Sequence, residues 1–332
     1  MHISYAGSSF VNKTIGLAMR IHLVAITLFS GLFLVQPISS YATSPVDSSF
    51  MLRVYEDSMK SLQYVRINAR TDKEKDTANA RLFILMKKAL LLPGSFNYPF
   101  DSLATIGIVM SPDKQFRLIT WDVPKEGCAF GYYGFVQAYN PAKKKYNLFV
   151  LEDHSADITT PKTGVFTPDK WLGMIYYKII KQKDTKFYTL LAWQGYNKMI
   201  THKVIDVISF NSQGAPLFGK SVYKKLPASF RGNPKRVIFE YSAEVTMTLR
   251  YDESKDRILF DHLIPIDDGL KGQYQYYGPS FQIDAMEWKN GEWNYMADVD
   301  ARNPKEKEDQ LFNNPKHPTY QPDKKAIYTA PH

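Results

Sequence analysis

The spacing of apolar residues changes once along the chain, near Thr105. Between Val46 and Leu92, apolar positions recur at steps of one, three or four, which places them on one face of a helix. A charged break, Arg70 to Asp76, interrupts this pattern, and Pro93-Gly94 ends it. The pattern therefore predicts two helices, each with one apolar face, joined by a polar turn.

From Thr105 onward, apolar positions alternate with a period of two, as in strands that bury one face. Asn290-Gly291, between two tryptophans, is a strong type I′ hairpin signal, and similar turn residues separate the other segments. The expected strands span 106–110, 116–121, 130–139, 146–152, 172–180, 187–193, 204–210, 237–241, 245–251, 257–264, 283–288 and 293–299.

These short strands follow one another without interleaved helices, which predicts a mainly β fold with an N-terminal helical segment. The arrangement is an antiparallel meander, for which a sandwich, a barrel and a propeller-like fold stay open. We find no repeat of fixed period in the sequence.

The N-terminal sequence has the pattern typical of an export signal. Lys13 and Arg20 precede an apolar run from Ile21 to Val35, and small residues up to Ala42 resemble a cleavage site. The run of about 15 residues is shorter than the ~20 that span a bilayer. We therefore expect a cleaved signal and a periplasmic or secreted protein, with an uncleaved membrane anchor as the alternative.

Four parts are expected along the chain: a signal peptide (1–42), a helical segment (43–95), an antiparallel β domain (96–302) and an extended or disordered Pro-rich tail (303–332). Apolar residues form 44% of the 332 residues, which is enough for a hydrophobic core. Because Cys128 is the only cysteine, no intrachain disulfide can staple that core.

The charge is basic but dispersed. The formal net charge is +9, and losing Lys13 and Arg20 with the signal would lower it to about +7. Nucleic-acid binding calls for basic residues concentrated on one face, so we expect no nucleic-acid partner.

One stretch, GAPLFGKS from Gly214 to Ser221, matches the pattern of a phosphate-binding P-loop. A working P-loop follows a parallel strand and opens a helix, whereas the residues after Ser221 alternate like a strand and stop at Pro227. Pro216 also removes a backbone donor from the loop. We therefore expect no ATP partner, and interpret the stretch as a turn at Gly214 followed by a return strand from Leu217 to Tyr223.

Asp153-His154 and Asp261-His262 raise the possibility of a catalytic dyad. Adjacent residues of a strand point to opposite faces, so neither pair can act as a dyad while its segment is extended. With Tyr251 opposite Ile258, His262 joins an apolar row with Phe260, Met247 and Phe239. The opposite face would gather four charged side chains, for which a structural ion-pair network is the alternative to a cleft: Arg236, Glu240, Arg250 and Asp261.

No spacing typical of a metal site is present, so we expect neither a metal nor a cofactor. A glycosidase needs only two carboxylates at a set separation, and several are available: Glu240, Glu244, Asp261, Asp267, Asp268 and Asp284. Candidate catalytic residues are Glu240, Arg250, Asp261 and His262. Tyrosines in two aromatic segments are candidate binding residues, although such rings also fill cores: Tyr132, Tyr133, Tyr274, Tyr276 and Tyr277.

From Trp171 to Val299 the chain resembles exported proteins of Bacteroidetes-type bacteria that have no characterised function. The stretches that carry this resemblance are WLGMIYYKII, YTLLAWQGYN, KVIDVISFNSQGAPLFG, RVIFEYS, ILFDHLIP and YYGPSFQIDA. The resemblance implies an envelope or extracellular setting and no catalytic residues. We expect a non-catalytic binding or structural protein with a glycan or envelope-protein partner. The alternative is a carboxylate-dependent, glycosidase-like hydrolase with a site near Glu240 and Asp261.

Overall fold

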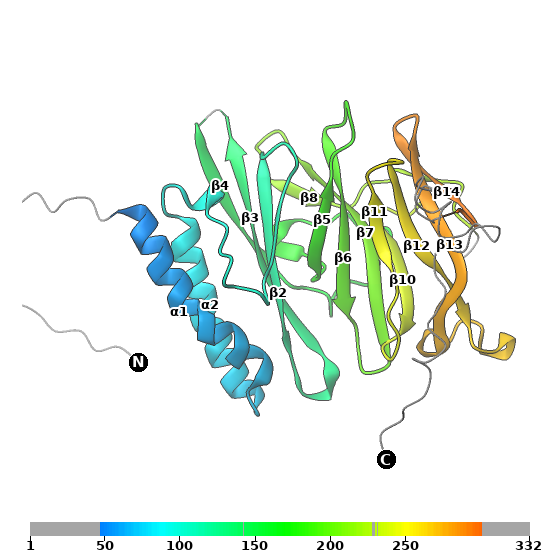
Figure 1. The fold of residues 1–332 in the computed structure, drawn as a ribbon, viewed down its shortest axis with the longest axis horizontal. Coiled ribbons are helices and arrows are strands. Elements are labelled where there is room, and N and C mark those ends of the chain that lie inside the picture. The colour runs from blue at the N-terminus through cyan, green and yellow to red at the C-terminus, as the bar shows by residue number, and fades with distance from the viewer. Residues whose placement is uncertain (1–46, 142, 228–229, 231, 301–332) are drawn as a thin grey trace, which may run out of the picture. The chain divides into compact units, whose positions relative to one another are not determined.

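A computed structural model describes residues 47–300, apart from 142, 228–229 and 231. The predicted signal peptide (1–42) and tail (303–332) lie outside the described residues. Within them, two helices precede fourteen strands that form three sheets (Figure 1). The fold is mainly β and antiparallel with an N-terminal helical segment, as the sequence predicts, and none of these sheets closes into a barrel.

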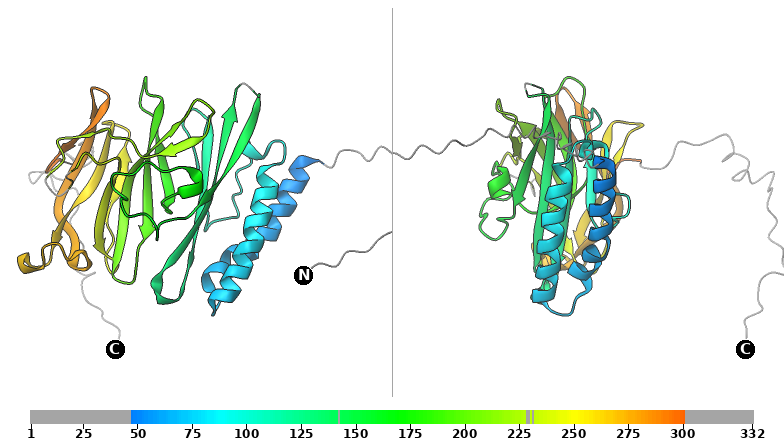
Figure 2. Two further views of the ribbon diagram at one scale, coloured as in Figure 1. Left: turned by 180° about the vertical axis from the view of Figure 1, so that it is seen from behind. Right: turned by 90° about the vertical axis from the view of Figure 1, so that its left-hand side faces the viewer.

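The two helices are α1 (Ser48–Asn68) and α2 (Asp72–Leu90). Asp47 caps the first helix through its carboxylate. Thr71 and Glu74 form a reciprocal capping box at the second, so most of the charged stretch expected to be a break forms the first turn of α2. Figure 2 shows the two helices packed side by side.

The first sheet has the order β1-β2-β3-β4 and is antiparallel throughout. Its strands are β1 (Gly107–Met110), β2 (Phe116–Pro124), β3 (Phe130–Asn140) and β4 (Lys145–Glu152). One face packs on the helices, where Met59 and Trp121 are fully buried in one core cluster. The Trp121 indole donates a hydrogen bond of 2.7 Å to Asn79 on α2, which fixes the helices against this sheet.

The second sheet has the order β10-β7-β6-β5, with a short strand, β8, added to β7. Its strands are β5 (Ile175–Ile180), β6 (Phe187–Gly195), β7 (Ile200–Phe210), β8 (Pro216–Phe218) and β10 (Val237–Ser242). It packs face to face on the first sheet through a core that includes Leu118, Tyr176 and Leu190. Figure 1 shows this sheet between the other two.

The third sheet has the order β11-β12-β13-β14-β9. Its strands are β9 (Tyr223–Lys224), β11 (Leu249–Asp252), β12 (Arg257–Pro265), β13 (Tyr277–Lys289) and β14 (Glu292–Met296). Neighbours are antiparallel except β9, which runs parallel to β14. Phe239, Phe260 and Trp293 belong to the core that joins this sheet to the second.

The hairpin prediction near Tyr251 is confirmed, but its extension is wrong. Tyr251 pairs with Ile258 as expected. We expected the segment that contains Phe239 to continue the same meander; instead β10 pairs with β7 in the second sheet. Residues 243–248 carry the chain over to the third sheet. Phe239 and Met247 therefore meet by packing between two sheets rather than by strand pairing.

The GAPLFGKS stretch forms a turn and a strand, as predicted, but the return strand is split. Gly214 has φ +78° in the turn, and β8 pairs with β7 directly after it. Tyr223 then starts β9 in another sheet. Gly219 has φ +99°, and a Cβ there would lie 2.5 Å from the Arg236 guanidinium, which accounts for this glycine.

Arg236 forms a deeply buried ion pair with Asp206 of the second sheet. Its Nε lies 3.1 Å from Oδ1 of Asp206, and both side chains are almost fully buried. Its other nitrogens donate to the backbone carbonyls of Pro161, Gly164 and Phe218. The pair thus ties the loop before the second sheet to β7, β8 and β10.

Replacing Arg236 with Met should lower the free energy of unfolding by about 3–5 kcal/mol, because the Asp206 carboxylate is left buried without its partner. Urea denaturation of the two proteins measures this. Arg250, an exposed arginine, is the matched control, and Arg250→Ala should change stability by no more than about 0.5 kcal/mol. Equal losses in the two variants would contradict a special role for the buried pair.

Candidate functional site

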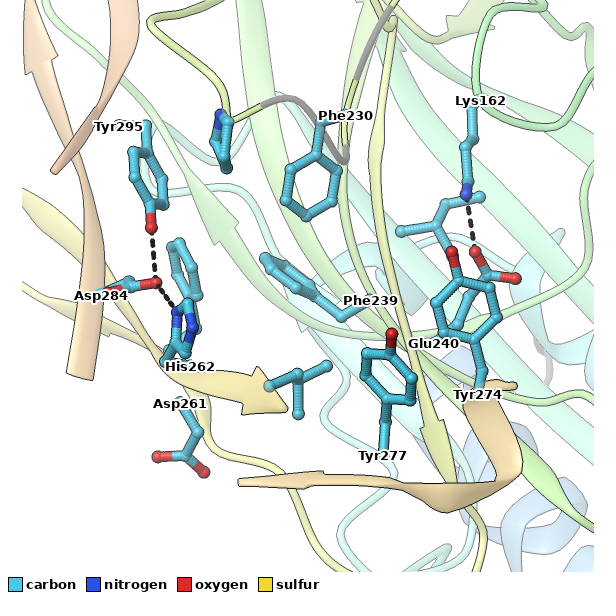
Figure 3. Close-up of a pocket in the computed structure, with 14 residues that line it drawn as sticks. Lys162, Phe230, Phe239, Glu240, Asp261, His262, Tyr274, Tyr277, Asp284 and Tyr295 are labelled. Atoms are coloured by element: carbon cyan, nitrogen blue, oxygen red, sulfur yellow. Dashed lines mark hydrogen bonds and ion pairs between the residues drawn. The ribbon is translucent and has the colours of Figure 1, made fainter. Parts of the chain in front are cut away.

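A cavity of about 140 Å³ opens where the second and third sheets meet (Figure 3). Its walls come from β10, β12, β13 and β14, from the short helix η6 (Tyr274–Tyr276), and from two loops that supply Lys162 and Phe230. These strands belong to two different sheets, β10 to the second and β12 to β14 to the third. The cavity therefore exists only because the two sheets pack against each other.

Aromatic rings form the inner surface of this cavity. The Phe239 and Phe260 rings, one from each sheet, lie 4.7 Å apart, and Phe230 packs edge-on against Phe239 at 5.6 Å. Phe239 and Phe260 belong to the buried core between the sheets. The apolar surface is thus preformed by core packing.

One polar wall consists of His262, Asp284 and Tyr295 (Figure 3). The Asp284 Oδ2 atom lies 2.7 Å from Nδ1 of His262 and accepts a hydrogen bond of 2.7 Å from the Tyr295 hydroxyl. Its other oxygen accepts bonds from the Gln282 side chain and the Asp298 backbone. The Asp284 side chain is only 3% exposed, whereas that of His262 is 37% exposed.

His262 lies at a register irregularity between β12 and β13. Asp261 pairs with Ile283 and Leu263 with Pro279, so three residues of β13 stand opposite His262 alone. The imidazole then reaches Asp284, whose Cα is paired with that of Phe260. Asp261, the sequence neighbour, makes no such contact, in agreement with the expectation that adjacent strand residues do not form a dyad.

Hydrogen bonds keep the Asp284 carboxylate ionised. Burial raises its pKa, but the bonds from Tyr295, His262, Asp298 and Gln282 outweigh burial and lower the pKa below its usual value. Burial, together with Asp284, raises the pKa of the Tyr295 hydroxyl, which therefore stays protonated and donates. An ionised carboxylate can only accept, so Nδ1 of His262 carries a proton. In the neutral ring, Nε2 then presents a lone pair.

The facing wall holds an ion pair. Nζ of Lys162 lies 2.6 Å from Oε2 of Glu240 on β10. The other Glu240 oxygen is 3.9 Å from Nε2 of His202, which is buried next to the cavity. Burial, with a smaller contribution from Lys162, lowers the pKa of His202 to about 4, so this imidazole is neutral and its contact with Glu240 is not an ion pair.

Two of the predicted tyrosines form the rim. The Tyr274 and Tyr277 rings lie 5.1 Å apart, and the Tyr277 hydroxyl accepts a bond of 2.9 Å from the Gly272 backbone. Both line the cavity. Tyr276, between them, is 41% exposed and is not part of the lining. Sequence reasoning could not separate it from its neighbours, because the local fold of η6 decides which rings turn inward.

The predicted catalytic residues are only partly brought together. Glu240, Asp261 and His262 line the cavity, but the Asp261 carboxylate points away from it (Figure 3) and accepts a bond of 2.7 Å from the Thr248 backbone. Arg250 is exposed outside the lining. The expected network of these residues with Arg236 does not form, because β10 belongs to the second sheet while β11 and β12 belong to the third.

The other aromatic segment lies elsewhere. Tyr132 is buried and its hydroxyl donates to the Gly195 carbonyl, whereas half-buried Tyr133 stacks on Trp121. They line a wider groove of about 970 Å³ between α2 and the ends of β3 and β4. In the Asp153-His154 pair, Nδ1 of His154 lies 3.2 Å from Oδ2 of Asp157, and the imidazole does not bond to Asp153.

Two polar residues of the cavity, Lys162 and Tyr295, gained no role from the sequence, and Asp284 was named only among the carboxylates available to a glycosidase. Asp284 carries a usable signal, because strand alternation places this carboxylate on the same face as Met286 and hence toward a core. A carboxylate on an apolar face requires several donors. Lys162 lies in a loop, where no periodicity marks it.

Comparisons with protein-family models, with curated proteins and with solved structures gave no match to this chain. The resemblance to exported Bacteroidetes proteins therefore stays a prediction. No helix within residues 47–300 is long and apolar enough to cross a membrane. The described part of the chain also contains no group of three or more His, Cys, Asp or Glu side chains placed to hold a metal ion.

Acid should destabilise the protein through His202. The unfolded chain protonates this imidazole near pH 6.5, whereas the folded protein does so near pH 4. Between these values the unfolded state binds more protons, so stability falls as the pH drops, by up to about 3 kcal/mol. Unfolding free energies from pH 7 to pH 4 should show a shallower decline in His202→Gln than in the wild type.

The control for this experiment is His154→Gln, which removes an exposed imidazole and should keep the wild-type pH dependence. If His202→Gln loses stability as steeply as the wild type, the buried neutral imidazole is not the source of the effect.

Proposed function

We propose that the protein is an exported binding module of the bacterial cell envelope, with a glycan or a protein as its partner. The observation that carries this proposal is the cavity between the second and third sheets, which is rimmed by Tyr274 and Tyr277. Export, and a periplasmic or secreted location, rest on the N-terminal sequence pattern and are part of the same proposal.

The cavity suits one ring of a ligand. Its volume of about 140 Å³ is close to that of a ~150 Å³ protein cavity that binds benzene. Aromatic faces can stack on the apolar side of a sugar ring, while Glu240 and His262 offer hydrogen-bonding groups at the walls. An aromatic surface combined with a few polar groups favours a terminal sugar residue over a purely apolar ligand.

Binding should depend on the inward tyrosines. We expect Tyr274→Ala and Tyr277→Ala each to weaken glycan binding about tenfold or more, because each removes one wall of a ring-sized cavity. A glycan array identifies the ligand, and calorimetry with that ligand measures affinity. Tyr276→Ala is the matched control and should bind like the wild type. Equal losses in all three variants would contradict binding in the cavity that Tyr274 and Tyr277 line.

A second candidate is the carboxylate-dependent hydrolase expected from the sequence: Glu240 lines the cavity, and Asp261 is in the same lining with its carboxylate bonded to the Thr248 backbone. For this candidate, Glu240→Gln or Asp261→Asn should lower turnover of a chromogenic aryl glycoside about 100-fold or more while the protein stays folded. Glu244→Gln, at an exposed carboxylate nearby, should have no effect. Turnover that survives both lining substitutions excludes this candidate.

A further inference from the structure

We propose that the cavity also performs chemistry: His262, oriented by Asp284, acts as a general base that activates water to hydrolyse an acyl ester on the bound ring. This activity goes beyond binding and rests on the proposed function, because the same cavity holds the ligand. The substrate class is an ester of a ring-sized alcohol, such as an O-acylated sugar.

The orientation of the imidazole is fixed by its surroundings. Asp284 holds Nδ1 at 2.7 Å, and the carboxylate is itself held by Tyr295, Gln282 and the Asp298 backbone. The ring lines the cavity, and its Nε2 has no hydrogen-bond partner among the described residues. A base positioned by a buried carboxylate, with its second nitrogen open to a ligand, is the arrangement that general-base catalysis requires.

The charges around the cavity favour an ester over a glycoside. Hydrolysis of a glycoside needs two carboxyl groups that flank the bond. The Asp261 carboxylate is turned toward Thr248, and Asp284 is enclosed by its donors, which leaves Glu240, paired with Lys162. An ester carbonyl, in contrast, can be attacked by water once a base removes the proton of that water.

The reaction balances with water as the only other reactant. Nε2 of His262 takes a proton from water as the water oxygen bonds to the ester carbonyl carbon. The tetrahedral intermediate then breaks its bond to the alcohol oxygen, and the imidazolium returns the proton to that oxygen. The products are a carboxylic acid and the free alcohol. Lys162, Tyr274 and Tyr277 supply the polar hydrogens of the lining that can stabilise the oxyanion.

The test uses the purified full chain and p-nitrophenyl acetate, whose aromatic ring matches the cavity. We expect His262→Gln to lower kcat/KM about 100-fold or more. His154→Gln, which removes the imidazole of an exposed Asp-His contact outside the cavity, should keep wild-type turnover. Because His262→Gln could act through folding, His262→Ala is assayed with added imidazole, which should restore turnover by occupying the vacated space.

A separate measurement, the position of the proton on the His262 imidazole, tests whether Asp284 acts as a positioning residue. Nuclear magnetic resonance of ¹⁵N-labelled imidazole should place the proton of His262 on Nδ1 in the wild type. In Asp284→Asn the side-chain amide can donate to Nδ1, so the proton should move to Nε2 and kcat should fall. A proton already on Nε2 in the wild type would overturn the assignment.

The outcomes separate this inference from the proposed function. Turnover that is equal in His262→Gln and His154→Gln, or that imidazole does not restore in His262→Ala, rejects His262 as the base. If glycan binding still depends on Tyr274 and Tyr277 in that case, the binding function stands alone. If His262-dependent turnover occurs without glycan binding, the proposed glycan is wrong while the catalytic assignment stands.

Discussion

The second sheet is covered on both faces, and this constraint sets most of the remaining structure. Neighbouring residues of β6 point to different cores: Leu190 faces the first sheet and Leu191 the third. A charged side chain in such a sheet needs a partner. Asp206 on β7 has Arg236, and two of the three carbonyls that Arg236 binds, those of Pro161 and Gly164, belong to the loop around Lys162. Burial of the second sheet therefore also positions the cavity wall that contains Lys162.

The sequence predicts the elements well because their determinants are local. Helix periodicity, strand alternation and turn residues identify the two helices, nearly all of the strands and the hairpin that pairs Tyr251 with Ile258. Sheet membership is not local: nothing between Ser242 and Leu249 marks the passage from one sheet to another. That single crossing puts Glu240 and Asp261 in different sheets, and the predicted network of Arg236, Glu240, Arg250 and Asp261 does not form.

Only part of the candidate site could be predicted, because residue type is local information whereas sheet membership and register are not. Glu240, His262, Tyr274 and Tyr277 could be chosen by residue type, and the structure gathers them in one lining. The partner of His262 could not, because it depends on the register of β12 against β13, which no local pattern in the sequence sets. The phosphate-loop pattern was rightly interpreted as a turn and a strand, but the sequence could not show that Gly219 is required by the buried Arg236 guanidinium.

The parallel pairing of β9 with β14 has a consequence for how the chain folds. Most paired strands are joined by short connections, so the entropic cost of closing the loops between them is small. Tyr223 instead pairs with Trp293, across all the residues that form β10 to β13. Of the strand pairings, this one closes the longest connection and so carries the largest loop-closure cost, which raises the contact order of the fold. The short strand β9, which follows the phosphate-loop pattern, thus joins distant parts of the chain.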